Sequence, residues 1–193
     1  MIRQGSFIVG QDDLRAMGLL LADFQLLPGR VVKERPEAIP ESGGVYSIFM
    51  QGGEGKVNRH LLDQAGAVNM FAAWPVLYIG ATEDSLRARL KCHYVRDSRA
   101  STFRRSVGLL AQEPLGLRVQ QLAGSRAFCF ENEQPLSNWL EAETLIAIAA
   151  CANPFTIEGQ LLAAAPGLVN LAGRPDTPVS LRLREGRAAA SGL

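Results

Sequence analysis

Two short strings of β-forming residues constrain the fold of this chain more than any other feature. The first is Gly44-Val45-Tyr46 and the second is Leu77-Tyr78-Ile79-Gly80, so their tyrosines stand 32 residues apart. Each string sets a tyrosine in an apolar run beside a glycine. Because runs of aromatic and β-branched residues are typical of strands, we expect strands at residues 45–49 and 76–79.

Hydrophobic periodicity elsewhere predicts helices and a third strand. Helical patterns occupy residues 83–95, 101–111, 137–143 and 153–165, with Thr82 and Ser137 as the expected caps of the first and the third. The apolar run at residues 145–150 is compatible with a third, buried strand. Three short strands with helices around them indicate the α/β class.

Proline and glycine positions divide the chain into segments. Residues 11–27 have helical spacing and residues 28–43 hold three prolines, so residues 1–40 are expected to form an N-terminal helix and a linker that pack on the core. Residues 41–185 form the main domain, with an insertion at 50–75. Within this insertion, residues 57–72 are open between a short helix and an irregular excursion. The Ala- and Gly-rich residues 186–193 are expected to be a flexible tail.

Composition excludes several classes of protein. A net charge of +1 means that any nucleic-acid interface must be local, and 47% apolar residues allow a packed core. Three cysteines without CxxC spacing argue against a disulfide framework or a zinc site and favour a reducing compartment. Because neither a signal peptide nor an apolar stretch of bilayer length is visible, we expect a cytoplasmic protein without membrane contact.

Four further residues carry chemistry that fits phosphodiester cleavage. Arg89 and His93 stand four residues apart on the predicted helix at 83–95, so both side chains can reach the same pocket. The guanidinium of Arg89 offers a planar, permanently charged fork for phosphate oxygens. Glu158, on the last predicted helix, is the only carboxylate of the set, and Asn170 follows it.

In this order, the two tyrosines and these four residues resemble the GIY-YIG nuclease family. Gly44-Val45-Tyr46 is similar to the first family signature, with valine in place of isoleucine, and Tyr78-Ile79-Gly80 is identical to the second. The resemblance covers residues 41–173. It implies an α/β fold of the α+β type, with a small, mainly antiparallel three-stranded sheet flanked by helices. The run at residues 101–108 is also similar to a segment of a stand-alone bacterial subgroup of the family.

The resemblance implies a metal-dependent endonuclease and gives each residue a role. Tyr46 is the general base that acts on water, His93 accepts its proton, and Tyr78 orients water or phosphate. Glu158 holds one divalent metal ion, Mg²⁺ in the first place and Mn²⁺ as the alternative, whose other ligands are mostly water and phosphate. Asn170 braces the site through hydrogen bonds.

A basic stretch beside these residues supplies the expected contacts with nucleic acid. Residues 87–105 hold seven basic side chains and one acid, a local charge of +6 in a chain of net charge +1. Such a run is also typical of a solvated helix face, but its place beside the site favours contacts with backbone phosphates. Besides Arg89, its basic residues are Arg87, Lys91, Arg96, Arg99, Arg104 and Arg105.

The leading interpretation is an endonuclease that acts on duplex or structured DNA. The rivals are a non-catalytic nucleic-acid-binding or assembly module with the same fold, and a nuclease that acts on RNA or branched DNA. Retention of all six site positions weighs against the module. The sequence leaves two questions open: whether the protein is a monomer or a weak homodimer, and whether the insertion is a harmless excursion, a substrate-contacting loop or a partner surface.

Overall fold

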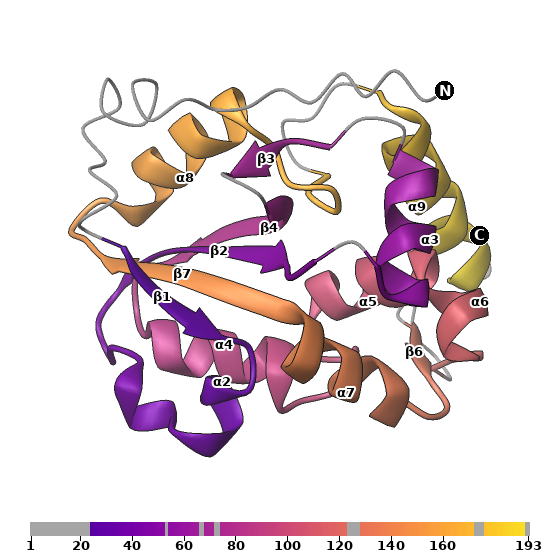
Figure 1. Cartoon of the computed structure of the whole chain (residues 1–193), viewed down its shortest axis with the longest axis horizontal. Coiled ribbons are helices and arrows are strands. Elements are labelled where there is room, and N and C mark those ends of the chain that lie inside the picture. The colour runs from indigo at the N-terminus through magenta and orange to yellow at the C-terminus, as the bar shows by residue number, and fades with distance from the viewer. Residues whose placement is uncertain are drawn as a thin grey trace.

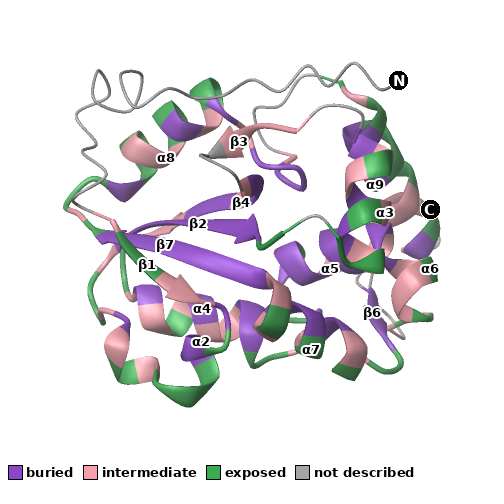
Figure 2. Ribbon diagram, viewed as in Figure 1, coloured by how far each residue is buried: buried purple, intermediate pink, exposed green. Residues whose placement is uncertain are grey.

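A five-stranded antiparallel sheet forms the centre of the fold (Figure 1). The computed structural model describes residues 24–52, 54–65, 68–71, 74–122, 128–171 and 176–191. The three expected strands make up the middle of the sheet, where β2 (Gly44–Met50) lies between β7 (Thr144–Ala150) and β4 (Trp74–Thr82). Every residue of β2 is buried (Figure 2). The predicted α/β fold of the α+β type is confirmed.

Two edge strands widen the sheet beyond the three strands predicted. β1 (Gln25–Pro28) pairs with β7, and β3 (Met70–Phe71) pairs with β4. β1 occupies the end of the segment predicted as a helix over residues 11–27, so that prediction is wrong for residues 25–27; residues 1–23 lie outside the described residues. Pairing with β7 prevails there over local helical spacing. Pro28 is tolerated because it ends a strand at the edge of the sheet.

Helices cover both faces of the sheet. Their bounds are α2 (Val31–Glu34), η2 (Pro36–Ala38), α3 (Lys56–Ala65), α4 (Leu86–Tyr94), α5 (Thr102–Leu110), α6 (Gln112–Leu115), α7 (Gln134–Glu143), α8 (Pro154–Ala164) and α9 (Pro178–Ala190). α8 lies over one face, and α2, α4 and α7 lie over the other (Figure 1). A separate two-stranded sheet pairs β5 (Val119–Gln121) with β6 (Phe128–Phe130). Within the described ranges, none of these helices combines the length and the apolar character that a membrane span requires.

Alternate side chains of β2 enter two different apolar clusters. Tyr46 and Ile48 belong to the larger cluster, together with Leu90 of α4. Phe49 belongs to the smaller cluster, together with Leu161 of α8. This alternation follows from the pleat of a strand, and it turns Tyr46 towards the face that α4 covers.

Two helices begin at residues other than those expected. Ser85 caps α4, since its hydroxyl accepts a hydrogen bond from the backbone N–H of Ala88 at 3.1 Å. Thr82 is not the cap, because it still belongs to β4. α7 begins at Gln134 rather than at Ser137, since a proline in its first turn favours the earlier start.

Described residues of the predicted insertion at residues 50–75 contribute to the packed core. It contains α3, whose Leu61 is fully buried. Asn58 of the same helix accepts a hydrogen bond from Nε1 of Trp139 at 2.8 Å. Of the two alternatives for residues 57–72, the helix is observed as far as Ala65, whereas residues 70–71 form β3. The contacts of α3 support a packing role for this helix.

The C-terminal segment is helical, contrary to the flexible tail expected at residues 186–193. α9 begins with a capping box and continues to Ala190. Leu183 and Ala190 are buried in the larger apolar cluster. The prediction of a flexible tail is therefore wrong for residues 186–190, because small and apolar residues that look like a terminus in sequence pack against the core.

Candidate active site

Tyr46 stands at the centre of the candidate active site, on the middle strand of the sheet. Its side chain is fully buried, and the strand register sets it opposite Gly80 of β4. A Cβ atom at Gly80 would lie 2.5 Å from Cζ of Tyr46 and 2.9 Å from Cε1 of Tyr78. The glycine of the second signature therefore makes room for the tyrosine of the first.

The Tyr46 hydroxyl joins two residues of α4. It lies 2.7 Å from Nε2 of His93, and it accepts a hydrogen bond from Nε of Arg89 at 3.3 Å. Arg89 and His93 are one helical turn apart, so both reach the same phenol, as their spacing predicts.

His93 is fully buried, and its second ring nitrogen also has a partner. Nδ1 lies 2.8 Å from Oγ of Ser101, and the ring of Phe103 packs with its centroid 5.2 Å away. Burial, together with the charges of Arg89 and Arg104, lowers the pKa of His93 from its ordinary 6.5 to about 3. The imidazole is therefore neutral near pH 7, so one of its nitrogens donates a hydrogen bond and the other accepts one.

Tyr78 is the phenol nearer to solvent, since it is only partly buried. Its ring centroid lies 6.1 Å from that of Tyr46 and 5.1 Å from that of Phe103. Burial raises the pKa of both phenols, and the charge of Glu158 adds to this effect, whereas Arg89 opposes it. Both phenols therefore keep their protons near neutral pH.

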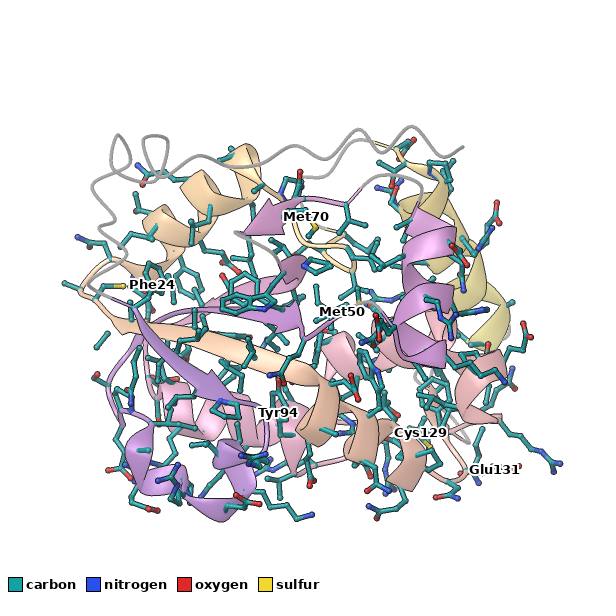
Figure 3. The ribbon with its side chains drawn as sticks, in the orientation of Figure 1. Phe24, Met50, Met70, Tyr94, Cys129 and Glu131 are labelled. Atoms are coloured by element: carbon teal, nitrogen blue, oxygen red, sulfur yellow. The ribbon has the colours of Figure 1, made fainter. Side chains whose placement is uncertain are left out.

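The third tyrosine of the chain has a structural role. Tyr94, which Figure 3 labels, is buried at the end of α4. Its hydroxyl lies 2.8 Å from Oγ1 of Thr144. This contact ties α4 to the start of β7, so Tyr94 offers a matched control for substitutions of the site tyrosines.

Glu158 is a half-buried carboxylate on α8, near the two phenols. Burial raises its pKa, while the charge of Arg89 and the backbone N–H of Ala81 oppose that rise. The part of the chain that the structure describes has no group of three His, Cys, Asp or Glu side chains that could hold a metal ion. A divalent ion at Glu158 would therefore take its other ligands mainly from water and substrate oxygens, and a lone carboxylate of this kind fits Mg²⁺.

Asn170 braces β4 within the second signature. Its side chain is only 5% exposed. Oδ1 accepts a hydrogen bond from the N–H of Ile79 at 2.9 Å, and Nδ2 donates one to the carbonyl of the same residue at 2.8 Å. Because Ile79 stands between Tyr78 and Gly80, these two bonds fix the strand at the point where it contributes to the site.

The predicted basic surface contains both paired and unpaired side chains. Arg87 bonds to the carboxylate of Glu41, and Arg99 bonds to that of Asp97. Much of the charge of these two arginines is therefore balanced locally. Three members have no carboxylate within 4.0 Å among the described residues, namely Lys91, Arg96 and Arg105.

Arg104 is an interior residue, so its assignment to the nucleic-acid surface is corrected. Its side chain is 1% exposed. The guanidinium bonds to Glu133 at 2.9 Å, to Oγ of Ser137 at 2.9 Å and to the carbonyl of His93 at 3.1 Å. A buried guanidinium requires such partners, and here they also fix the end of α4 that carries His93.

Three further residues lie beside the site, and the sequence did not predict a functional role for them. Ser101 bonds to His93, and Phe103 packs against it. Both belong to the run at residues 101–108, and its resemblance to a bacterial subgroup was the one signal that pointed to them. The third residue, Arg187, bonds to α5 from α9, and the expectation of a flexible tail concealed it.

Comparison with known proteins agrees with this geometry. A family model described as the GIY-YIG catalytic domain matches residues 44–189, from the first signature into α9. No curated protein and no solved structure matches the chain significantly. The family match confirms the resemblance to GIY-YIG nucleases and indicates, in general terms, a nuclease-type function on nucleic acid. The chain belongs to the GIY-YIG catalytic domain family.

Proposed function

We propose that the protein is a metal-dependent endonuclease that hydrolyses phosphodiester bonds in DNA. One observation carries the proposal, namely that the Tyr46 hydroxyl is held between Nε2 of His93 at 2.7 Å and Nε of Arg89 at 3.3 Å. In this arrangement the Tyr46 hydroxyl can pass its proton to His93, and the Arg89 guanidinium beside it can bind a phosphate. Family membership supports the nuclease class in general.

Tyr46 acts as a general base by relaying a proton to His93. It is not a phenolate before the reaction begins. Burial raises its pKa, so the phenol keeps its proton until the reaction begins. As water attacks phosphorus, the phenol oxygen takes a proton from water while the phenol's own proton passes to Nε2 of His93. This path uses the His93 tautomer with its proton on Nδ1, which donates to Oγ of Ser101 at 2.8 Å. A bound phosphate raises the pKa of His93 through its negative charge and so favours the transfer.

Arg89 and Tyr78 position the reactants. Arg89 uses Nε for the Tyr46 hydroxyl and also interacts with the Tyr78 hydroxyl, and the rest of its planar fork contacts phosphate oxygens in this proposal. Tyr78 is less buried than Tyr46, so its hydroxyl is the better placed of the two to orient water or phosphate.

Glu158 holds one divalent ion, with Mg²⁺ as the first choice and Mn²⁺ as the alternative. When bound, the ion supplies electrostatic stabilisation to the charge that develops on the phosphate and the leaving oxygen. The half-burial of Glu158 strengthens its attraction for a cation, because less water screens the carboxylate.

DNA is the substrate class that the proposal names, through contacts with the phosphate backbone. Lys91, Arg96 and Arg105 supply cations beside the site, and no base-reading motif accompanies them in the sequence. RNA or branched DNA is the alternative substrate. A non-catalytic binding module is the alternative function, and the presence of all six site residues weighs against it.

Cleavage of defined substrates tests this proposal. Supercoiled plasmid, single-stranded DNA, a four-way junction and an RNA hairpin are incubated with Mg²⁺ or with EDTA. We expect nicking of DNA in Mg²⁺, no cleavage in EDTA and none by Glu158→Ala, whereas Glu185→Ala on the exposed side of α9 cuts like the parent. Binding without cleavage of any substrate would support the binding module, and cleavage confined to RNA would change the substrate class.

A further inference from the structure

α9 brings an arginine of the C-terminal segment to the first turns of α5. Nη2 of Arg187 donates to the carbonyl of Thr102 at 3.2 Å and to Oγ of Ser106 at 2.5 Å. Phe103 follows Thr102, and its ring centroid lies 5.1 Å from that of Tyr78. The guanidinium is therefore anchored one residue along the chain from a side chain that packs directly on the candidate active site.

A second arginine lies close to this anchored guanidinium. Arg105 belongs to the same stretch of α5, and its Cζ lies 5.9 Å from the ring centroid of Phe128. Burial lowers the pKa of Arg187, and the charge of Arg105 lowers it further, whereas Tyr78 opposes both effects. Arg187 bonds to Ser106, the residue after Arg105, so both arginines belong to the stretch of α5 whose Phe103 packs on Tyr78.

Neither of these two arginines has the carboxylate partner that other described arginines have. Among the described residues, no carboxylate lies within 4.0 Å of either, and Nε of Arg187 is buried without a hydrogen-bond acceptor. By contrast, Arg104 on the same helix and Arg184 on α9 each pair with an acid. A partly buried cation pair with an unused N–H donor is costly unless an anion neutralises it.

We propose that Arg105 and Arg187 form a second phosphate subsite, next to Tyr78, that holds a backbone phosphate of nucleic acid beside the phosphate being cut. This inference rests on the proposed function, since it takes nucleic acid as the substrate. Nη2 of Arg187 stays on α5, the exposed part of its planar guanidinium meets the phosphate, and Arg105 adds the second charge. The subsite fixes the position of the strand, so it acts on affinity and on KM.

Binding measured without cleavage tests the subsite. The full chain is titrated in EDTA against a fluorescent DNA duplex across a series of salt concentrations, with Arg187→Gln and its matched control Arg184→Gln. We expect Arg187→Gln to weaken affinity roughly tenfold and to reduce the slope of log K against log salt by about one, the effect of one lost phosphate contact. We expect Arg184→Gln to change affinity less than about twofold, because that side chain is exposed and pairs with Asp176.

Double substitution separates a shared phosphate from two independent contacts. If Arg105 and Arg187 hold the same phosphate, the loss in the double Gln variant is smaller than the product of the two single losses. Equal affinity and salt slope for Arg187→Gln and Arg184→Gln would overturn the subsite. If Arg187→Gln fails to fold, Arg187→Lys keeps the charge and loses the planar fork, so it should keep the parental salt slope with weaker affinity. A parental affinity for Arg187→Lys as well would overturn the role of the fork.

Two further outcomes distinguish the subsite from the proposed function and from a free anion site. A chain that binds DNA through Arg187 but never cuts would retain the subsite and refute the nuclease. A chain that cuts DNA with parental KM after Arg187→Gln would refute the subsite alone. Inorganic phosphate that raises the Tm of the parent but not of Arg187→Gln, without competing with DNA, would overturn the assignment to a nucleic-acid backbone.

Discussion

The Tyr46 hydroxyl lies 2.7 Å from Nε2 of His93, and neither side chain is exposed to solvent. Burial favours the neutral form of each, since it raises the pKa of the phenol and lowers that of the imidazole. The Tyr46–His93 pair is therefore suited to transferring a proton, whereas a lasting phenolate or imidazolium is disfavoured. Because the pair is buried, protonation of His93 also changes the free energy of unfolding.

Stability should fall as the pH falls below 6.5, because His93 is buried in its neutral form. Its pKa is about 3 in the fold and 6.5 in its ordinary state, so the unfolded chain binds a proton in this window that the folded chain does not bind. The free energy of unfolding should decrease by up to about 1.4 kcal/mol for each pH unit between 6.5 and 5. Urea unfolding at several pH values measures this slope, and His93→Gln should flatten it. An equal slope in both proteins would contradict the burial of a neutral imidazole.

Two glycines should respond to alanine in opposite directions. Gly80→Ala places a Cβ 2.5 Å from Cζ of Tyr46, so it should destabilise the fold by about 1–3 kcal/mol and abolish cleavage by displacing the phenol. A Cβ at Gly159, one residue after Glu158, meets nothing within 4 Å. Gly159→Ala should therefore raise the free energy of unfolding by up to about 1 kcal/mol, since alanine favours the helix. Urea unfolding and plasmid nicking of both variants test the pair.

Arg104 should behave as a core residue rather than as a surface cation. Arg104→Met leaves the carboxylate of Glu133 without its guanidinium, so it should cost about 3–5 kcal/mol of stability. The exposed Arg96 serves as the matched control, and Arg96→Met should change stability by less than about 0.5 kcal/mol. A small effect of Arg104→Met on urea unfolding would contradict the buried ion pair.

The central elements of the fold were predictable because each has a local sequence signal. The three middle strands are runs of apolar and β-forming residues, and α5 and α8 have clear starts. β1 was not predictable, because residues 25–28 become a strand only by pairing with β7. α9 has a local start signal at Thr177 and Pro178, but its small residues near the end resemble a frayed terminus and are buried only by contacts with distant parts of the chain.

The sequence predicts that Arg89 and His93 share one site with Tyr46, but it does not predict the contacts around them. The order of the six residues pointed to a common site, and the i, i+4 spacing brought Arg89 and His93 to one phenol. Sequence alone does not show which basic residue turns inward. Arg104 does so because it pairs with Glu133, which stands 29 residues away at the N-cap of α7. Ser101 and Arg187 acquire their contacts in the same way, through packing between helices.

The cleavage rate of Tyr46→Phe tests the central claim most directly. The substitution removes only the hydroxyl between Arg89 and His93, and Tyr94→Phe is its control, because that hydroxyl contacts Thr144 outside the site. With Mg²⁺ and the preferred DNA substrate in excess, Tyr46→Phe should lose at least about a hundredfold in kcat, the range for removal of a general base, while it still binds DNA. Tyr94→Phe should keep a kcat close to that of the parent. A folded Tyr46→Phe protein that cuts at the parental rate would contradict the role of Tyr46 as the general base.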